Sequence, residues 1–181
     1  MKGHALAIVD RAITNPRDAL GTIERNTEIK VVLFVLCALG WDVASDLSFA
    51  FQIKRATLDG AKAANAADFA LKDDLGLCAI GEAKQWGVDD RGWDRGLAQV
   101  KRYQRALGTP RAFLTCGKRW IVLDQSQNVA DDIRVDKRTP NATALVARLE
   151  PFLGKGRIEG QVTNAGLWHY GVSPPSVSRR A

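Results

Sequence analysis

Two charged side chains near the middle of the chain have the types and spacing of a site that does chemistry. Glu82 and Lys84 stand two residues apart at the end of the apolar segment LCAIGEAK (77–84), which predicts a strand. Side chains two apart in a strand point to the same face, so a carboxylate and an ammonium emerge together there. Charges at the end of an apolar strand are expected to be paired or used.

A second carboxylate precedes them on another predicted strand. Asp68 opens the segment ADFALK (67–72), and a tight turn over 73–76 joins it to the next strand, so the two strands are expected to pair as a hairpin. Pairing brings Asp68 near Glu82 and Lys84. Two carboxylates beside a lysine provide the hard oxygen ligands that suit Mg²⁺. Such a metal can activate water and offset charge developing on a phosphodiester. The lysine can orient or deprotonate the water, or stabilise the transition state.

Strict alternation along 77–84 also predicts what surrounds the two charges. Cys78 and Ile80 should share the face of Glu82. The opposite face should then carry mostly small residues, as close packing of a helix would need: Leu77, Ala79, Gly81 and Ala83.

Glu28 offers a third carboxylate. It opens an apolar helix predicted over 28–39, with Thr27 as its N-cap. Helical spacing places it on one face with three apolar residues: Val32, Val35 and Leu39. A glutamate at a helix start also complements the helix dipole, and the sequence leaves that role and a role in the site equally open.

A later helix, predicted over 93–107, carries polar side chains at helical spacing. Gln99 and Tyr103 are one turn apart and share a face. Three arginines form a stripe beside Gln99 and are candidates for contacts to a nucleic-acid backbone: Arg91, Arg95 and Arg102. For the arginines alone, a solvated charged face is the simpler interpretation.

The order of the predicted elements defines the fold class. Helices come first, and then strands at 47–53, 67–72 and 77–84, the helix at 93–107, a hairpin over 111–124, a short strand near 132–135 and a helix near 142–152. This order predicts an α/β sandwich with a mixed sheet. We expect one domain over 1–153 and a loosely held tail over 154–181, which Leu167, Trp168 and Tyr170 can dock.

Composition narrows the class of protein. The chain has 181 residues, a formal net charge of +6 and a pI of about 9.5, so its surface should attract polyanions. The three cysteines lie far apart in apolar runs, which favours buried thiols and a reducing compartment over a zinc site. The apolar run 29–39 is too short to span a bilayer. A cytoplasmic protein with no membrane partner is therefore expected.

An ordered set of short motifs resembles a known family. The set is TE (27–28), LGW (39–41), ADFAL (67–71), GEAK (81–84), QVKRY (99–103) and LTCGKRWIVLD (114–124). It looks like the N-terminal nuclease domain of type I restriction enzyme motor subunits, within the PD-(D/E)xK superfamily. The match covers roughly residues 24 to 125. An ExK pair alone is a weak motif, whereas the ordered set is much more specific.

The resemblance implies roles for particular residues. Asp68 and Glu82 would bind the metal, Lys84 would be the catalytic lysine, and Glu28 the helix acid. Gln99 and Tyr103 would be the family's QxxxY pair. It also implies a restriction-endonuclease-like three-layer α/β/α sandwich and a Mg²⁺-dependent nuclease, with Mn²⁺ able to substitute. The substrate would be DNA, with cleavage leaving 5′-phosphates.

The sequence departs from the family in three respects. Ala67 replaces the proline before the aspartate, and Cys116 stands where the family often has asparagine. No Walker motif is present, so we expect a stand-alone nuclease domain that uses no ATP. Cutting both strands would favour a homodimer, although the sequence does not decide between endonuclease and exonuclease.

Other functions fit the same residues. The chain can be a catalytically inactive nucleic-acid-binding or assembly module of the same fold, although the intact set Asp68, Glu82 and Lys84 argues against decay. A structural protein with a surface ion pair would leave the QVKRY helix unexplained. The strand form of the substrate, and DNA against RNA, stay open on the residues alone.

Overall fold

A computed structural model of the protein describes residues 2–20, 24–44, 49–54, 66–73, 76–136 and 139–158. The helices are α1 (Lys2–Thr14), α2 (Pro16–Ala19), α3 (Glu24–Thr27), the π-helix η1 (Glu28–Val32), α4 (Leu33–Ala38), α5 (Asp90–Leu107), α6 (Ala142–Leu153) and α7 (Lys155–Ile158). The strands are β1 (Phe49–Lys54), β2 (Ala66–Asp73), β3 (Gly76–Ala83), β4 (Arg111–Thr115), β5 (Arg119–Leu123) and β6 (Val129–Arg134).

The six strands form one sheet in the order in which they occur along the chain. Neighbouring strands are antiparallel except β3 and β4, which run parallel because α5 carries the chain back between them. The predicted α/β architecture with a mixed sheet is therefore confirmed. It is consistent with a restriction-endonuclease-like fold.

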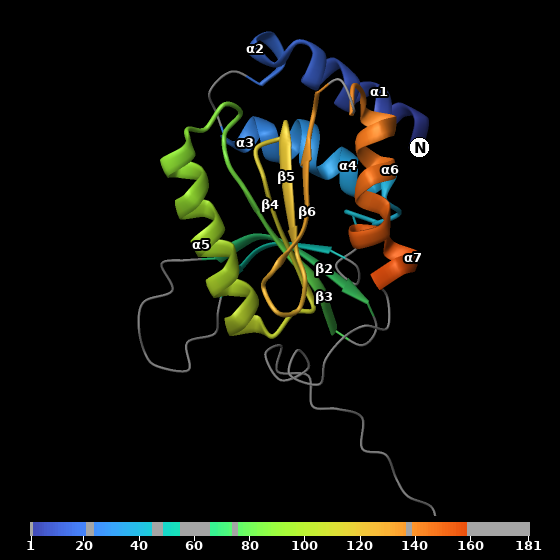
Figure 1. The fold of residues 1–181 in the computed structure, drawn as a ribbon. Coiled ribbons are helices and arrows are strands. Elements are labelled where there is room, and N and C mark those ends of the chain that lie inside the picture. Colours follow the sequence, from blue (N-terminus) through green and yellow to red (C-terminus); the bar gives the residue numbers. More distant parts are fainter. Residues whose placement is uncertain are drawn as a thin grey trace, which may run out of the picture.

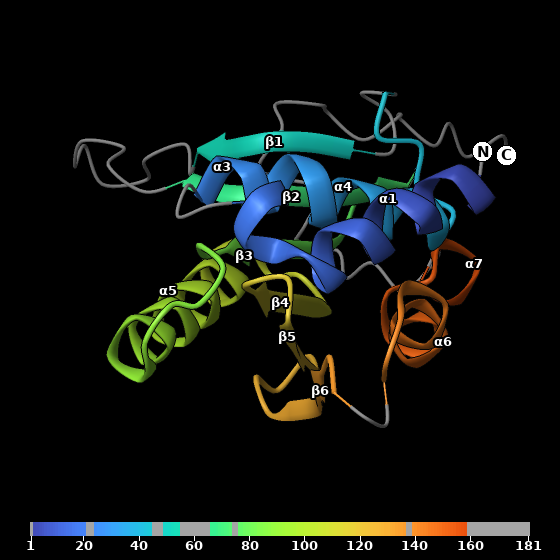
Figure 2. The same cartoon turned by 90° about the horizontal axis from the view of Figure 1, so that it is seen from above.

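Helices cover both faces of this sheet (Figure 1), with α5 on one side and α6 on the other in the view turned by 90° as well (Figure 2). Two apolar clusters correspond to these layers. One lies under α5 and includes Val100, Tyr103 and Leu107 of that helix. The other joins α1, η1, α4 and α6 to the opposite face of the sheet. Each face of β3 is therefore buried, which explains its almost continuous apolar sequence.

A β-bulge at Cys78 makes part of the predicted alternation wrong. Leu71 of β2 pairs with Ala79, whereas the next residue pairs with Leu77, so Cys78 is an extra residue without an opposite partner. As a result Leu77 belongs to the cluster under α5 with Ile80, and Cys78 belongs to the other cluster. From Ile80 onward the alternation is regular, and the position of Glu82 is unaffected.

The space beside Gly81 is filled by an aromatic ring and not, as the sequence predicts for this face, by a helix. A Cβ atom at Gly81 would lie 2.0 Å from Phe113, the residue beside it on the parallel strand β4. The Phe113 ring stacks between Phe69 and Trp120, with ring centroids 6.1 Å and 5.6 Å away. The missing side chain thus lets three aromatic rings cross the strand that carries Glu82.

The ends of helix α5 have clear sequence signals, although the helix starts three residues before the predicted position. The Asp89 side chain accepts a hydrogen bond from the Gly92 amide at 2.7 Å and caps the first turn. Gly108 ends the helix with a φ of 64°, a conformation that favours glycine.

Short helices lie near both ends of the described part of the chain. Pro16 opens the short helix α2, where its fixed φ is tolerated, and α2 ends at Ala19. At the other end α7 follows the predicted domain boundary at 153, and its Ile158 is buried. Leu167, Trp168 and Tyr170 lie outside the described residues, as do parts of the predicted strand 47–53 and of the turn 73–76.

The three cysteines all fall within the described ranges, and none forms a disulfide. Cys78 and Cys116 are buried as predicted, whereas Cys37 is only half-buried. Within the described part of the chain, no helix is long and apolar enough to cross a membrane.

Candidate metal and phosphodiester site

The antiparallel register of β2 and β3 brings Asp68 and Glu82 together. Phe69 pairs with Gly81, and Asp68 and Glu82 are the residues next to that pair, close enough for the charge of Asp68 to act on Glu82. Asp68 Oδ2 accepts a hydrogen bond from the Ala83 amide at 2.8 Å. This bond holds the carboxylate across the end of β3, and leaves Oδ1 without a partner among the described residues.

Glu82 and Lys84 form an ion pair at the end of β3. Lys84 Nζ donates to Glu82 Oε1 at 2.7 Å, and Glu82 is only 2% exposed. The second carboxylate oxygen, Oε2, is buried and has no hydrogen-bond partner. A buried carboxylate oxygen without a partner is costly, so it indicates a position where a ligand binds.

Gly96 of α5 positions the lysine, and sequence reasoning missed it. A Cβ atom at Gly96 would lie 3.1 Å from Lys84 Cε and 3.0 Å from Leu114 Cδ1. The helix therefore approaches β3 and β4 closely there, and the lysine stem packs against it. A glycine inside a helix is destabilising, and this close approach gives the physical reason for it.

A helix on the opposite face of the sheet from α5 supplies two further acids. Carboxylate oxygens of Glu24, Glu28 and Asp68 lie within 4.8 Å of one another. Glu28 is buried, and its Oε2 accepts from Arg25 Nη1 at 2.5 Å. The structure therefore brings the predicted helix acid to Asp68. Glu24 was not predicted, because the helix was expected to begin only after Thr27 and the contact with Asp68 depends on tertiary packing.

The helix that carries these acids differs from the prediction. Thr27 is not an N-cap, because its backbone is helical, its side chain makes no capping bond, and the helix already begins at Glu24. From Glu28 the chain forms one π-helical turn, in which the Leu33 amide bonds to the Glu28 carbonyl. Such turns are frequent at functional sites. Here Glu28 is near the strands while Val31, Val32 and Val35 are fully buried in the core.

Burial and mutual repulsion change the protonation of the two strand carboxylates. Burial, with the charge of Glu28, raises the pKa of Asp68 to about 6 against the effect of the Ala83 hydrogen bond. Burial and the charge of Asp68 raise the pKa of Glu82 to about 7, although Lys84 opposes this shift. Burial alone would lower the pKa of Lys84, but its hydrogen bond and charge contacts with Glu82 raise it overall. The lysine therefore stays an ammonium. Any added positive charge at the site would favour the ionised form of the two carboxylates.

Gln99 and Tyr103 lie together on α5. Gln99 Nε2 donates to Tyr103 Oη at 3.0 Å, and the tyrosine is buried under the helix. Gln99 follows Gly96 by three residues and so lies near the helix face that meets Lys84. Neither side chain has a hydrogen bond to a carboxylate of the site among the described residues.

The predicted arginine stripe is exposed on the same helix. Arg91, Arg95 and Arg102 are all solvent-exposed, and Arg102 lies over the Tyr103 ring with its Cζ 5.6 Å from the centroid. Within the described part of the chain, none of the three forms an ion pair with the site's carboxylates. They are thus available to a partner molecule, outside the acid cluster.

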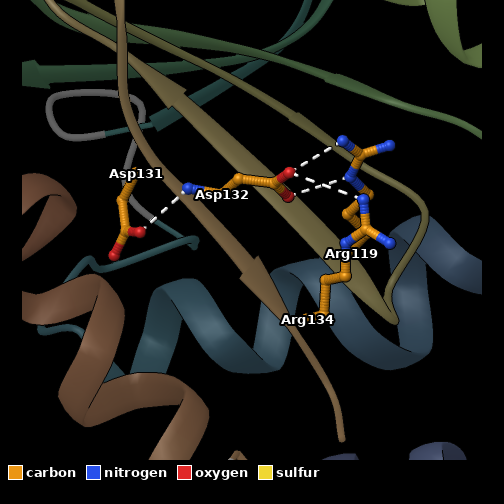
Figure 3. A network of polar contacts seen from close by, with 4 residues as sticks. All are labelled: Arg119, Asp131, Asp132 and Arg134. Atoms are coloured by element: carbon orange, nitrogen blue, oxygen red, sulfur yellow. Dashed lines mark hydrogen bonds and ion pairs between the residues drawn. The ribbon is translucent and has the colours of Figure 1, made fainter.

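A second network of polar side chains connects strands β5 and β6, away from the acid cluster (Figure 3). Arg119 donates to both oxygens of Asp132, at 2.8 and 2.7 Å, and Arg134 lies 3.6 Å from the same carboxylate. Arg119 also covers the Trp93 ring of α5, with its Cζ 4.7 Å from the centroid. The network joins the first turn of α5 to β5 and β6, so its role is to hold the helix in place.

Comparison with solved structures supports the fold. A chain of a DrdV–DNA complex matches with a TM-score of 0.55 and 13% identity, over 82% of this chain and 14% of that chain. A fragment of a putative HsdR subunit of a type I restriction enzyme from Vibrio vulnificus YJ016 has a TM-score of 0.46 and 25% identity, over 70% of this chain and 25% of that one.

This chain therefore spans a quarter or less of the length of either matched structure. The likeness to the DrdV chain shows a shared fold. No protein-family model matches the chain, and no curated protein does.

Proposed function

We propose that the chain is a Mg²⁺-dependent nuclease that hydrolyses phosphodiester bonds of DNA. The observation that carries the proposal is the buried, unpartnered Oε2 of Glu82, near Asp68 and bonded through its other oxygen to Lys84. A purely structural ion pair would leave no carboxylate oxygen buried and without a partner. The unpartnered oxygen of Glu82 is therefore able to act as a ligand of a cation.

The residues present fit a hard divalent cation. Asp68 and Glu82 supply carboxylate oxygens from adjacent strands, and Glu28 adds a third acid near Asp68. Mg²⁺ binds through a few carboxylates and keeps several waters, and Mn²⁺ accepts the same ligands. When bound, such an ion lowers the pKa of a water and offsets charge on a phosphate oxygen.

The chain's own residues supply the remaining chemistry. Lys84 is held at 2.7 Å from Glu82 and stays protonated, so its ammonium can orient the attacking water or stabilise the extra negative charge of the transition state. Gly96 lets α5 approach the lysine closely, and Tyr103 packs in the apolar cluster under the same helix. Positioning of this kind removes orientational freedom before the reaction.

DNA is the substrate that the surface favours. The formal net charge of +6 attracts a polyanion, and Arg91, Arg95 and Arg102 are exposed on the helix that holds Lys84. The chain shares its fold with one solved in a complex with DNA. The motif resemblance also points to DNA.

The test is a cleavage assay on supercoiled plasmid, linear duplex, single-stranded DNA and RNA, each with Mg²⁺, Mn²⁺ or EDTA. Metal-dependent cleavage of DNA that EDTA abolishes is the expected result, and 5′-phosphate ends are expected on the products. Absence of cleavage on every substrate with either metal, together with tight DNA binding, would assign the chain to the inactive binding modules of this fold.

A further inference from the structure

Trp86 differs from the other tryptophans in the described part of the chain. Trp41, Trp93 and Trp120 are buried. The indole N–H groups of Trp41 and Trp120 donate to backbone carbonyls at 2.7 and 3.1 Å. Trp86 is only half-buried and packs at the edge of the apolar core. A large aromatic side chain that stays partly accessible is suited to contact with a partner molecule.

Two glycines hold this side chain in one place. The Val88 amide donates to the Gln85 carbonyl at 3.2 Å, which closes a turn with Trp86 and Gly87 at its corner. Gly87 has a φ of 81°, as the third residue of a type II turn requires. A Cβ atom at Gly117 would lie 2.8 Å from Trp86 Cε3, so the six-membered ring rests directly on the Gly117 backbone. A ligand that binds this ring therefore has little side-chain motion to restrict.

Trp86 lies at the margin of the candidate metal site. It follows Lys84 by two residues, and two residues of chain span no more than about 7 Å. On its other side is the methyl group of Thr27, the residue before Glu28. Thr27 Cγ2 lies 3.4 Å from the same Cβ position at Gly117. The indole is thus close to both the lysine and the helix that carries Glu28.

We propose that Trp86 is a stacking platform for one unpaired nucleobase of the DNA, within one or two nucleotides of the scissile phosphate. The inference rests on the proposed function and deepens it, because it names the strand form of the substrate. Successive nucleotides of one strand lie about 3.4 Å apart along the axis of DNA, so a ring within about 7 Å of Lys84 reaches a base at this separation.

Stacking on a side chain needs a base whose face is free. In an intact duplex each internal base is stacked on both of its neighbours, so only a terminal, single-stranded or extruded base offers a face to the indole. Every base has such a face, so the platform selects strand form and not sequence. The exposed arginines of α5 act in the same sense, because contacts to phosphates carry no sequence information.

The test compares binding of three DNA molecules in EDTA by fluorescence anisotropy. They are a perfect duplex, the same duplex with one unpaired nucleotide, and a third in which that nucleotide lacks its base. Wild type should bind the unpaired base about tenfold more tightly than the abasic nucleotide, as expected for loss of one base–aromatic stack. Trp86→Leu should bind these two DNA molecules equally, and Trp86→Phe should keep most of the difference.

Phe152→Leu is the matched control, because Phe152 is a half-buried aromatic residue on α6. It should keep the tenfold ratio of wild type. Each protein is compared with itself on two DNA molecules, so a change in stability alone does not alter the ratio. Equal binding of the unpaired base and the abasic nucleotide by wild type, or the wild-type ratio in Trp86→Leu, would overturn the platform.

Cleavage of the same DNA molecules in Mg²⁺ separates this inference from the proposed function. Wild type should cut within two nucleotides of the unpaired base, and cuts at unrelated positions would overturn the assignment of Trp86 to the cleavage site. Metal-dependent cleavage with no effect of Trp86→Leu on the binding ratio would leave the proposed function standing without the platform. A ratio that depends on Trp86 without cleavage of any DNA would overturn the proposed function, and Trp86 would be the base contact of a binding module.

Discussion

Glu82 and Lys84 leave the end of β3 on one face and meet in an ion pair of 2.7 Å, with the glutamate buried and the lysine only partly so. The pair therefore differs from a surface salt bridge, which contributes little to stability. It also differs from a closed buried pair, because one glutamate oxygen has no partner. This combination of a protonated lysine and an incompletely satisfied acid underlies the predictions about catalysis.

Lys84→Ala should abolish cleavage while leaving folding and DNA binding nearly unchanged. In the proposed mechanism the ammonium acts only on charge that develops in the reaction, so its loss should lower the rate by about a hundredfold or more. Melting temperature should change little, because the lysine lies at the end of a strand and its removal also exposes Glu82 to water. Lys118→Ala, an exposed lysine in the β4–β5 turn, is the control. Full activity in Lys84→Ala would exclude this mechanism.

The arginines of α5 should contribute to affinity for DNA without contributing to sequence preference. Changing Arg91, Arg95 and Arg102 to glutamine should weaken binding on all duplexes alike, because phosphate contacts carry no sequence information. Each lost contact should reduce the slope of log K against log salt by about 0.9. Arg148→Gln on α6 is the control for loss of one positive charge away from α5, and its side chain pairs with Asp131. A slope that is unchanged in the triple variant would count against a backbone-contact role.

Local spacing made the strand part of the site predictable. Glu82 and Lys84 follow from a period of two along 77–84, and Asp68 follows from a short turn that sets the register of a hairpin. These relations depend only on neighbours in sequence. The bulge at Cys78 did not change the outcome because the alternation is regular again between it and Glu82.

Glu24, Gly96 and Arg119 could not be predicted because their partners are distant in the sequence. Glu24 reaches Asp68 only because the helix begins before Thr27, where an N-cap was expected. Gly96 matters only because α5 packs on Lys84, and Arg119 only because β5 lies beside Trp93. In each case tertiary packing decides the role, and no local pattern encodes it.

Gly81→Ala should destabilise the protein although it adds a single methyl group. A Cβ atom there would lie 2.0 to 2.5 Å from the ring of Phe113, which is enclosed by Phe69 and Trp120. Overpacking of a buried core typically costs 1–3 kcal/mol, so the loss should be about 2 kcal/mol, measured by urea denaturation. Gly3→Ala in α1 is the control, since nothing lies within 4 Å of its Cβ position. Equal stability of the two variants would mean that the ring stack adapts freely.

Without divalent cations, stability should fall as the pH rises through the range in which the site ionises. Burial raises the pKa of Asp68 from 3.8 to about 6 and that of Glu82 from 4.5 to about 7, so between these values the folded state binds more protons than the unfolded chain. The free energy of unfolding therefore decreases from about pH 4 to pH 7 and then levels off, by on the order of 3 kcal/mol per group. Asp68→Asn with Glu82→Gln removes both titrations, and the melting temperature of wild type relative to this variant should fall between pH 5 and 8 in EDTA. Mg²⁺ binds the ionised carboxylates, so it should reverse the fall in wild type only. A wild type that gains stability over the variant as pH rises in EDTA would contradict the raised pKa values.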